Sequence, residues 1–424
     1  MKRLISLLLV LFLLSGCGNT PIPEETKNTS EPPSVTVPLV KKKSVPTPLT
    51  WERINAIPVA TSDMTEEQLR QIVLDFFRLQ LTFQWTPAET FAYTITTYQE
   101  PRGFEAGTVY AGLPYQGSSN SGNLYLAMEY YDPETGILDN TEVDGQSLSL
   151  LLGNHCTSSP YWAWSRVINS VTQYANANMT EHYGFLPVGD YDYDFVQWSE
   201  VTQTKAVCKE NGEQRMYEAY ALLKPADGIF LYYSTGGNSH CRMVSSHPVV
   251  VRNADGSING DESYLLYMDQ GSGLKDYTAA DGTTVRLQGK VDFKATFSEL
   301  FSKSYIAFTF AEFLGTDPVE PGELTLALPK TVTPGEMIAG ELCSNYPISY
   351  FNVTLTDDSG NITYHKLIPA QGLNVSSIYL GKLINTSDIN PLIQTGDQTL
   401  TVQARISTGE LLTAYEGTLT ANKN

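Results

Sequence analysis

The sequence predicts an α+β protein in which a region of mixed helices and strands precedes a region built from strands alone. Helix signals and apolar strand runs alternate in residues 51–316, whereas residues 317–424 show short alternating runs separated by turns. The composition supports packed cores, because 42% of the 424 residues are hydrophobic and only 17% are charged. A chain of this length has room for about two or three domains.

The mixed region begins with a helix signal. Thr65-Glu66-Glu67-Gln68 matches a capping box, in which the first and last side chains each bond the other residue's backbone N–H. Pro87 sets a limit to the helix, because proline cannot continue the hydrogen-bond ladder. Apolar residues recur between these limits at the spacing of one helix face, at Leu69, Ile72, Val73, Phe76 and Leu79.

Residues 317–424 are typical of an immunoglobulin-like β-sandwich. Phe351, Val353 and Leu355 alternate with polar residues, and the same alternation returns from Leu400 to Ile406. Turn signals such as Asp357–Asn361 separate these runs. Because this region offers no cluster of catalytic side chains, we expect a spacer or a binding module, whose protein partner the sequence does not identify.

The charge balance argues against nucleic acid as a partner. Lys and Arg number 27 against 46 Asp and Glu, which gives a net charge of −19 at pH 7. A nucleic-acid binder needs basic side chains to replace phosphate counterions. His182 and His365 lack acidic or Cys partners at metal-ligand spacing, and Gly236-Gly237 is not followed by the Lys of a phosphate-binding loop. We therefore predict no metal and no cofactor.

The first residues indicate a location outside the cytoplasm. Lys2 and Arg3 precede an apolar stretch, Leu4 to Leu14, that is too short to span a bilayer stably. Leu14-Ser15-Gly16-Cys17 resembles the lipobox of bacterial lipoproteins, which implies cleavage before Cys17 and attachment of acyl chains to its thiol. An ordinary secretory signal with a chance Cys is the alternative. Residues 18–50 are rich in Pro, Thr, Ser, Glu and Lys, and we expect a disordered tether there.

Cys156 is the first candidate for chemistry. It precedes a stretch in which Pro160 suits the first turn of a helix, and a thiol at a helix N-terminus is favoured as thiolate. A small buried Cys without a chemical role is the alternative. His240 begins a later apolar strand, from which it could take the proton of Cys156. Asp269 and Gln270 end the next strand, and either could accept the N–H of His240.

These segments together resemble the NlpC/P60 and CHAP branch of the papain-like superfamily. "HCTSSPYWAWS" is similar to the nucleophile segment "DCSGFVYWAY", "LKPADGIFLYY" to "LKPGDLVFF", and "SHCRMV" to "GHVAIV". "YLLYMDQG" resembles the CHAP-type strand "ITVSEQN", and the upstream "VYAGLPYQG" resembles "GxPYxwGG". The resemblance covers about residues 105–275, under half of the chain.

The resemblance implies a papain-like domain, within residues 51–316, whose helix-borne Cys packs on an antiparallel sheet. Cys156 would then be the nucleophile and His240 the base, with Asp269, or alternatively Gln270, orienting the His. The family hydrolyses amide bonds in peptidoglycan peptides, so we expect a lipid-anchored cell-wall cysteine hydrolase. The backbone N–H of Cys156 would help to stabilise the oxyanion.

Several departures from the family pattern leave a second hypothesis open. His155 stands where the family usually has Asp, and Ser159-Pro160 and Ser239 replace other common residues. The alternative is therefore a catalytically inactive papain-like lipoprotein that binds wall fragments or a partner protein. Cys241 follows His240 and should point to the opposite face of the strand. Cys208, Cys241 and Cys343 could include one disulfide or remain free thiols.

Overall fold

The computed structural model describes residues 49–95, 99–117, 121–141, 145–169, 185–192, 204–232, 239–278, 284–328, 331–332, 340–370, 377–380, 389, 391–392 and 396–419. The predicted signal peptide, Cys17 and nearly all of the predicted tether lie outside these residues. None of the helices formed by the described residues is long and apolar enough to cross a membrane.

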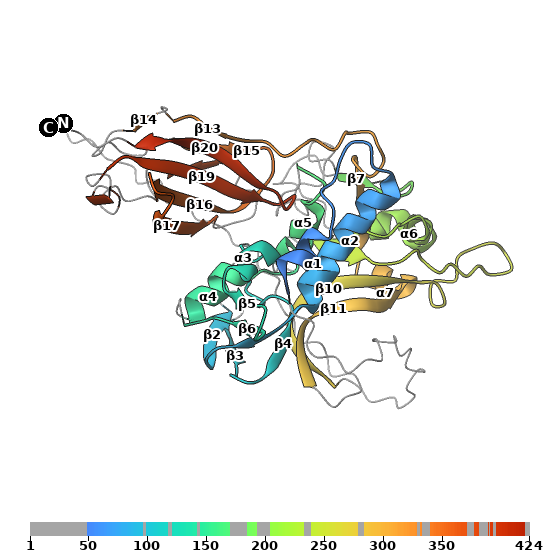
Figure 1. The fold of residues 1–424 in the computed structure, drawn as a ribbon. Coiled ribbons are helices and arrows are strands. Elements are labelled where there is room, and N and C mark those ends of the chain that lie inside the picture. The colour runs from blue at the N-terminus through green and yellow to red at the C-terminus, as the bar shows by residue number, and fades with distance from the viewer. Residues whose placement is uncertain are drawn as a thin grey trace, which may run out of the picture.

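The predicted α+β class is confirmed, with a large mixed sheet followed by β-sandwich-like sheets toward the C-terminus (Figure 1). The helices are α1 (Trp51–Asn55), α2 (Glu66–Thr82), α3 (Leu124–Met128), α4 (Gly145–Leu152), α5 (Ser158–Trp164), α6 (Thr204–Ala221) and α7 (Phe297–Ser302).

The large sheet has the order β5-β6-β1-β4-β11-β10-β9-β8-β12-β7, and β2 and β3 form a separate hairpin. Its strands are β1 (Gln84–Pro87), β4 (Val109–Ala111), β5 (Tyr131–Asp132), β6 (Ile137–Leu138), β7 (Phe185–Pro187), β8 (Gly228–Tyr232), β9 (Ser239–Val244), β10 (Tyr264–Thr278), β11 (Thr284–Thr296) and β12 (Ile306–Phe310). The hairpin strands are β2 (Phe91–Ile95) and β3 (Glu100–Phe104). At the centre, β8, β9, β10 and β11 pair antiparallel in chain order, so residues that follow one another along the chain become neighbours across the sheet.

Helix α2 forms as the sequence predicts. Both halves of the capping box are present, because Thr65 Oγ1 accepts from Gln68 N and Gln68 Oε1 accepts from Thr65 N. The helix ends at Thr82, before Pro87. Its apolar face is buried at the five predicted positions, Leu69, Ile72, Val73, Phe76 and Leu79.

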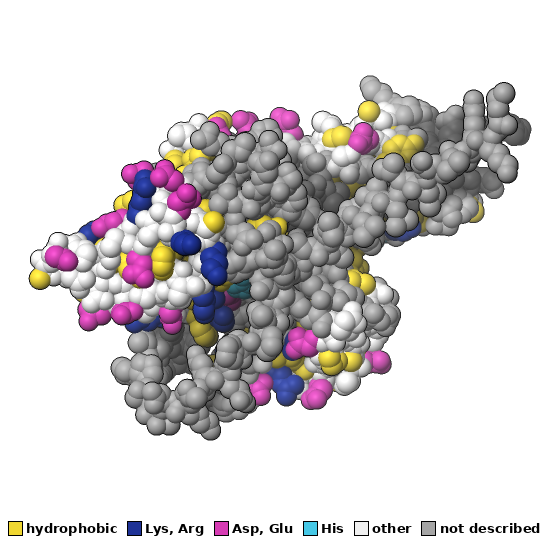
Figure 2. Space-filling model, turned by 180° about the vertical axis from the view of Figure 1, so that it is seen from behind, with side chains coloured by type: hydrophobic (Ala, Val, Ile, Leu, Met, Phe, Trp, Pro, Cys, Tyr) yellow, Lys and Arg dark blue, Asp and Glu magenta, His cyan; other side chains and the backbone are white. Residues whose placement is uncertain are grey.

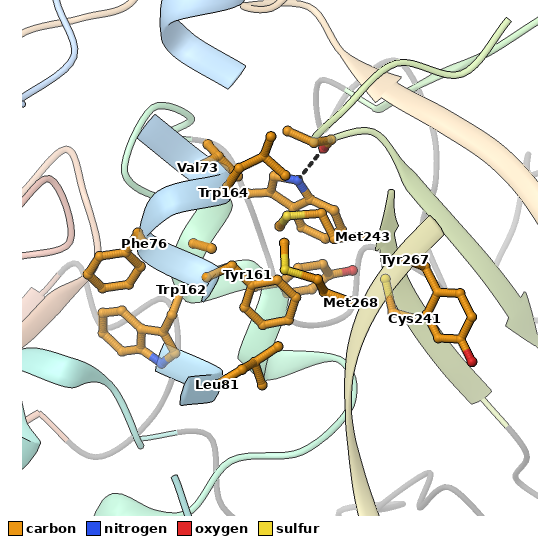
Figure 3. Close-up of a cluster of buried hydrophobic side chains, with 14 of the residues drawn as sticks. Val73, Phe76, Leu81, Tyr161, Trp162, Trp164, Cys241, Met243, Tyr267 and Met268 are labelled. Carbon is orange, nitrogen blue, oxygen red and sulfur yellow. Dashed lines mark hydrogen bonds between the residues drawn. The ribbon is translucent and has the colours of Figure 1, made fainter. Parts of the chain in front are cut away.

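One core joins α2, α5 and the middle of the large sheet (Figure 3). The Nε1–H of Trp164 donates to the carbonyl oxygen of Ala226 at 2.8 Å, so the indole is both buried and hydrogen-bonded. The side chains drawn together in Figure 3 include Val73, Phe76 and Leu81 from α2, Tyr161, Trp162 and Trp164 from α5, and Cys241, Met243 and Met268 from the sheet.

The C-terminal residues form a five-stranded sheet, β14-β20-β19-β16-β17, and a three-stranded sheet, β13-β15-β18. Their strands are β13 (Leu324–Leu326), β14 (Thr331–Val332), β15 (Glu341–Ser344), β16 (Ile348–Asp357), β17 (Ile362–Pro369), β18 (Ser377–Tyr379), β19 (Gln398–Ile406) and β20 (Leu411–Leu419). Val353 pairs with Val402 and Leu355 with Leu400, and all four side chains are fully buried. The predicted alternation is therefore confirmed in β16 and β19.

The C-terminal sheets pack directly against the chain that leaves α5. Ser407 Oγ donates to the carbonyl oxygen of Ser165 at 2.7 Å, and Tyr346 Oη donates to that of Val167 at 3.3 Å. Both acceptors follow α5 within three residues, so the C-terminal region fixes the far end of the segment that begins at Cys156.

Candidate active site

Cys156 lies in the turn before α5, beside the first residue of β9. Its Sγ is 3.7 Å from the carbonyl oxygen of Ser239 and 3.8 Å from Thr157 Oγ1. Ser239 directly precedes His240, so the structure brings the predicted nucleophile next to the strand that carries the predicted base. The Cys156 residue is 1% exposed.

The turn that holds Cys156 is capped by His155. The His155 Nδ1 accepts from the backbone N–H of Thr157 at 3.2 Å and of Ser158 at 3.5 Å, while Ser158 Oγ accepts from His155 N at 2.9 Å. Thr157 makes no side-chain cap of its own. His155 therefore supplies the acceptor that an N-terminal helix turn needs, and it does so only while Nδ1 carries no proton.

Helix α5 is short and anchored from α2. It spans seven residues, Ser158–Trp164. Gln80 Nε2 donates to Ser159 Oγ at 2.7 Å and to the Ser159 carbonyl oxygen at 3.1 Å. This buried amide ties the first turn of α5 to α2, a contact that the sequence pattern gave no means to predict.

His240 and Asp269 form a direct hydrogen bond. His240 Nε2 lies 2.8 Å from Asp269 Oδ2, with the His side chain 23% exposed and the Asp side chain 1% exposed. Because an ionised carboxylate only accepts, Nε2 carries the proton in this bond. The lone pair of neutral His240 is then on Nδ1, and a proton from Cys156 would have to be taken there.

Two further cations approach the same carboxylate oxygen. Arg242 Nε donates to Asp269 Oδ2 at 3.2 Å, and Lys290 Nζ lies 3.6 Å from it. Burial alone would raise the pKa of Asp269, but the hydrogen bond with His240 and the charges of His240, Lys290 and Arg242 hold it well below the usual range. Asp269 is therefore an anion throughout the neutral pH range.

Gln270 does not orient His240 in the contacts of this site. Its Nε2 donates to the carbonyl oxygen of Leu113 at 2.8 Å, and it is fully buried. Neither Asp269 nor Gln270 ends its strand, contrary to our expectation, because β10 continues to Thr278 in a long hairpin with β11. The β10–β11 register shifts on both sides of the Asp269–Gln270 pair.

The upstream segment that resembles "GxPYxwGG" packs beside the residues that precede Cys156 in the chain. Gln116 N donates to the carbonyl oxygen of Asn154 at 3.0 Å, and Tyr115 N donates to Gln288 Oε1 at 2.8 Å. Gln270 holds the same segment through Leu113. Three of the five stretches that carry the resemblance, those with Leu113, Cys156 and Gln270, thus meet in one place.

The remaining Cys and His residues add no second site to the described part of the chain. Cys156, Cys208, Cys241 and Cys343 form no disulfide with one another. Cys241 is fully buried and shares a face of β9 with Met243, away from His240. No group of three or more His, Cys, Asp or Glu residues that could hold a metal ion occurs among the residues with described positions.

Of three comparisons with known proteins, only the one with solved structures finds a likeness. No family model matches it, and no curated protein matches it. It is similar to the crystal structure of CopC from Methylosinus trichosporium OB3b, with 14% identity, coverage of 24% of this chain and 98% of that chain, and a TM-score of 0.16. A likeness at that TM-score carries no argument about fold or function.

Proposed function

We propose that this protein is a papain-like cysteine hydrolase that cleaves amide bonds in peptidoglycan peptides while anchored to the cell membrane through Cys17. The single observation that carries the proposal is the His240–Asp269 hydrogen bond at 2.8 Å, with the Cys156 thiol beside the residue that precedes His240. The substrate class and the anchor come from the sequence resemblances alone.

The arrangement supports a two-step reaction. The Cys156 proton passes to His240 Nδ1, and the thiolate attacks the amide carbonyl carbon. The tetrahedral intermediate expels the amine, which takes the proton from His240, and leaves a thioester on Cys156. His240 then accepts a proton from water, whose oxygen attacks the thioester, and the proton returns to Sγ as the acid leaves. Asp269 keeps the proton on Nε2 in every step.

The burial of Cys156 favours a second candidate function. A carbonyl carbon must reach Sγ for the reaction, yet only 1% of the residue is exposed. A scaffold that binds wall fragments or a partner protein without cleaving them needs no such access. The two candidates differ in one measurable property, the coupling between the Cys156 thiol and His240.

The pH dependence of Cys156 alkylation by iodoacetamide tests this coupling. We expect an apparent thiol pKa of about 6 or lower in the wild type and a clearly higher value in His240→Ala. Cys156→Ser defines the background from the other four Cys residues of the chain. A thiol that titrates near the ordinary value of about 8.5 in both proteins supports the binding scaffold instead.

Substrate hydrolysis provides the second part of the test. Release of new amino groups from purified peptidoglycan peptides should require Cys156 and should vanish in Cys156→Ser. If the thiol is reactive and coupled to His240 but no wall peptide is cleaved, the cysteine hydrolase proposal stands and peptidoglycan peptides are excluded as its substrates.

A further inference from the structure

The Arg242 side chain packs against two aromatic rings beside the candidate site. Its guanidinium carbon lies 4.2 Å from the ring centroid of Tyr267 and 4.6 Å from that of Tyr305, and the residue is 8% exposed. A planar guanidinium stacks well on aromatic faces, which a lysine ammonium cannot reproduce. Because side chains two apart share a face of a strand, Arg242 lies on the same side of β9 as His240.

We propose that Arg242, assisted by Lys290, is a positioning residue that sets the pH range in which His240 holds its proton. The catalytic role of Arg242 rests on the proposed function. The titration of His240 can be measured without a substrate. The sequence resemblance does not predict this role for Arg242, because the "GHVAIV" pattern has Ala at that position.

The charges around Asp269 carry the argument. Asp269 Oδ2 lies 2.8 Å from His240 Nε2, 3.2 Å from Arg242 Nε and 3.6 Å from Lys290 Nζ. An isolated Asp next to a His stabilises the imidazolium and makes the His more basic. Here two permanent cations offset that carboxylate, so a proton added to His240 adds to a positive surplus.

Among the described residues, the two tyrosines packed on Arg242 do not cancel this surplus, and Glu299, whose charge reaches Tyr267, bonds the backbone N–H of Thr296. Burial raises the pKa of Tyr267 to about 12 and that of Tyr305 well above its usual value, so both hydroxyls stay neutral. The Cys156 thiol lies 3.7 Å from the carbonyl oxygen of Ser239, the residue directly before His240.

The surface agrees with a local excess of positive charge. Figure 2 shows several Lys and Arg side chains gathered on one face of the molecule, with Asp and Glu side chains around them, although the whole chain carries a net charge of −19. A His whose proton is lost near the working pH is an efficient general base, whereas one locked as imidazolium is not. The charges of Arg242 and Lys290 thus favour neutral His240, which can accept a proton.

NMR titration of the His side chains in the full chain tests the inference. The sequence has five His residues, and His240→Gln identifies the resonance of His240. In Arg242→Met, which removes the charge, we expect the His240 titration midpoint to rise by about one pH unit. In Arg242→Lys, which keeps the charge, it should stay within about 0.3 units of the wild type. A midpoint in Arg242→Met that is unchanged or lower overturns the proposal.

Lys290 supplies a test that does not depend on removing a buried side chain. Its side chain is 31% exposed, so Lys290→Gln should fold, and we expect a rise of about half a pH unit. Lys294→Gln is the matched control on the same strand, because the Lys294 ammonium lies 4.1 Å from the ring centroid of Tyr264 rather than beside Asp269. Equal midpoints in Lys290→Gln and the wild type also overturn the proposal.

The outcome is separable from that of the proposed function. If the His240 midpoint moves as expected while Cys156 alkylation shows no coupling to His240, the hydrolase proposal fails and the charge cluster stands. If Cys156 and His240 are coupled but the midpoint is the same in Arg242→Met, Lys290→Gln and the wild type, the hydrolase stands and the role given to Arg242 fails.

Discussion

Asp269 in the large sheet and Glu312 after β12 are both buried carboxyl groups, with 1% and 6% of the residue exposed, yet their pKa values move in opposite directions. Burial is the largest influence on each and raises both. At Asp269, His240, Lys290 and Arg242 outweigh it. At Glu312, burial and the negative charge of Asp317 raise the pKa to about 7.

The difference lies in the surroundings: cations stabilise the ionised form of Asp269, whereas burial disfavours the ionised form of Glu312. Glu312 lies where the linker to the C-terminal sheets begins, and its charge also affects Tyr346, which bonds the chain after α5. Its Oε2 has no hydrogen-bond partner among the described residues. The cations around Asp269 keep a carboxylate ionised in the interior, which indicates a function for its charge.

Asp269→Asn should have the largest effect on activity. An amide can donate to His240 Nε2 and so favour the wrong tautomer, which leaves no acceptor on Nδ1 for the Cys156 proton. We expect peptide hydrolysis to fall by about 10³- to 10⁴-fold, measured as turnover at saturating substrate. Glu312→Gln is the control, and its turnover at pH 7 should match the wild type. Comparable losses in both variants would remove the functional distinction between the two carboxyl groups.

Asp269→Ala should also destabilise the fold. Arg242 would be left buried without its carboxylate, which costs about 3–5 kcal/mol in urea unfolding at pH 7. The folded pKa of Asp269 lies below its unfolded value of about 3.9, so this stability is complete above about pH 4 and is lost as the pH falls further. The difference between the two proteins should therefore shrink in acid. A difference that is the same at pH 3 and pH 7 would contradict the charge argument.

Glu312→Gln should give the opposite pH dependence. The folded pKa of about 7 lies above the ordinary value of 4.5, so between these values the folded state keeps a proton that the unfolded state has released. Wild-type stability should fall as pH rises through this window, and the Gln variant should gain up to about 3 kcal/mol relative to it at pH 8. Unfolding curves at pH 4.5 and 8 measure this. No gain at pH 8 would mean that Glu312 is not strained by ionisation.

The sequence was sufficient for the parts of the fold that repeat a local pattern. The α2 capping box and the alternation in β16 and β19 each depend on residues close together in the chain, and both are confirmed. The order of Cys156, His240 and Asp269 along the chain also predicted which strands would be neighbours, because β8, β9 and β10 follow one another across the sheet.

Contacts that depend on register or on packing between distant segments were beyond the sequence. Lys290 reaches Asp269 across a β10–β11 pairing whose register shifts on both sides of Asp269. Asp269 meets His240 and Gln270 does not, because successive side chains of a strand point to opposite faces, and Gln270 donates to Leu113 instead. Glu312 lies close enough to Tyr346 of the C-terminal region to raise its pKa, and no local sequence pattern reports this proximity.

The smallest expected effect concerns His155, which serves the site as a hydrogen-bond acceptor rather than as a charge. His155→Ala removes the acceptor for Thr157 N and Ser158 N and should cost about 1 kcal/mol in unfolding free energy, with slower alkylation of Cys156. His155→Asn, whose side-chain oxygen is a good cap, should restore most of both. If Ala and Asn behave alike, the cap does not hold the Cys156 turn, and the nucleophile depends on the Gln80 anchor of α5 instead.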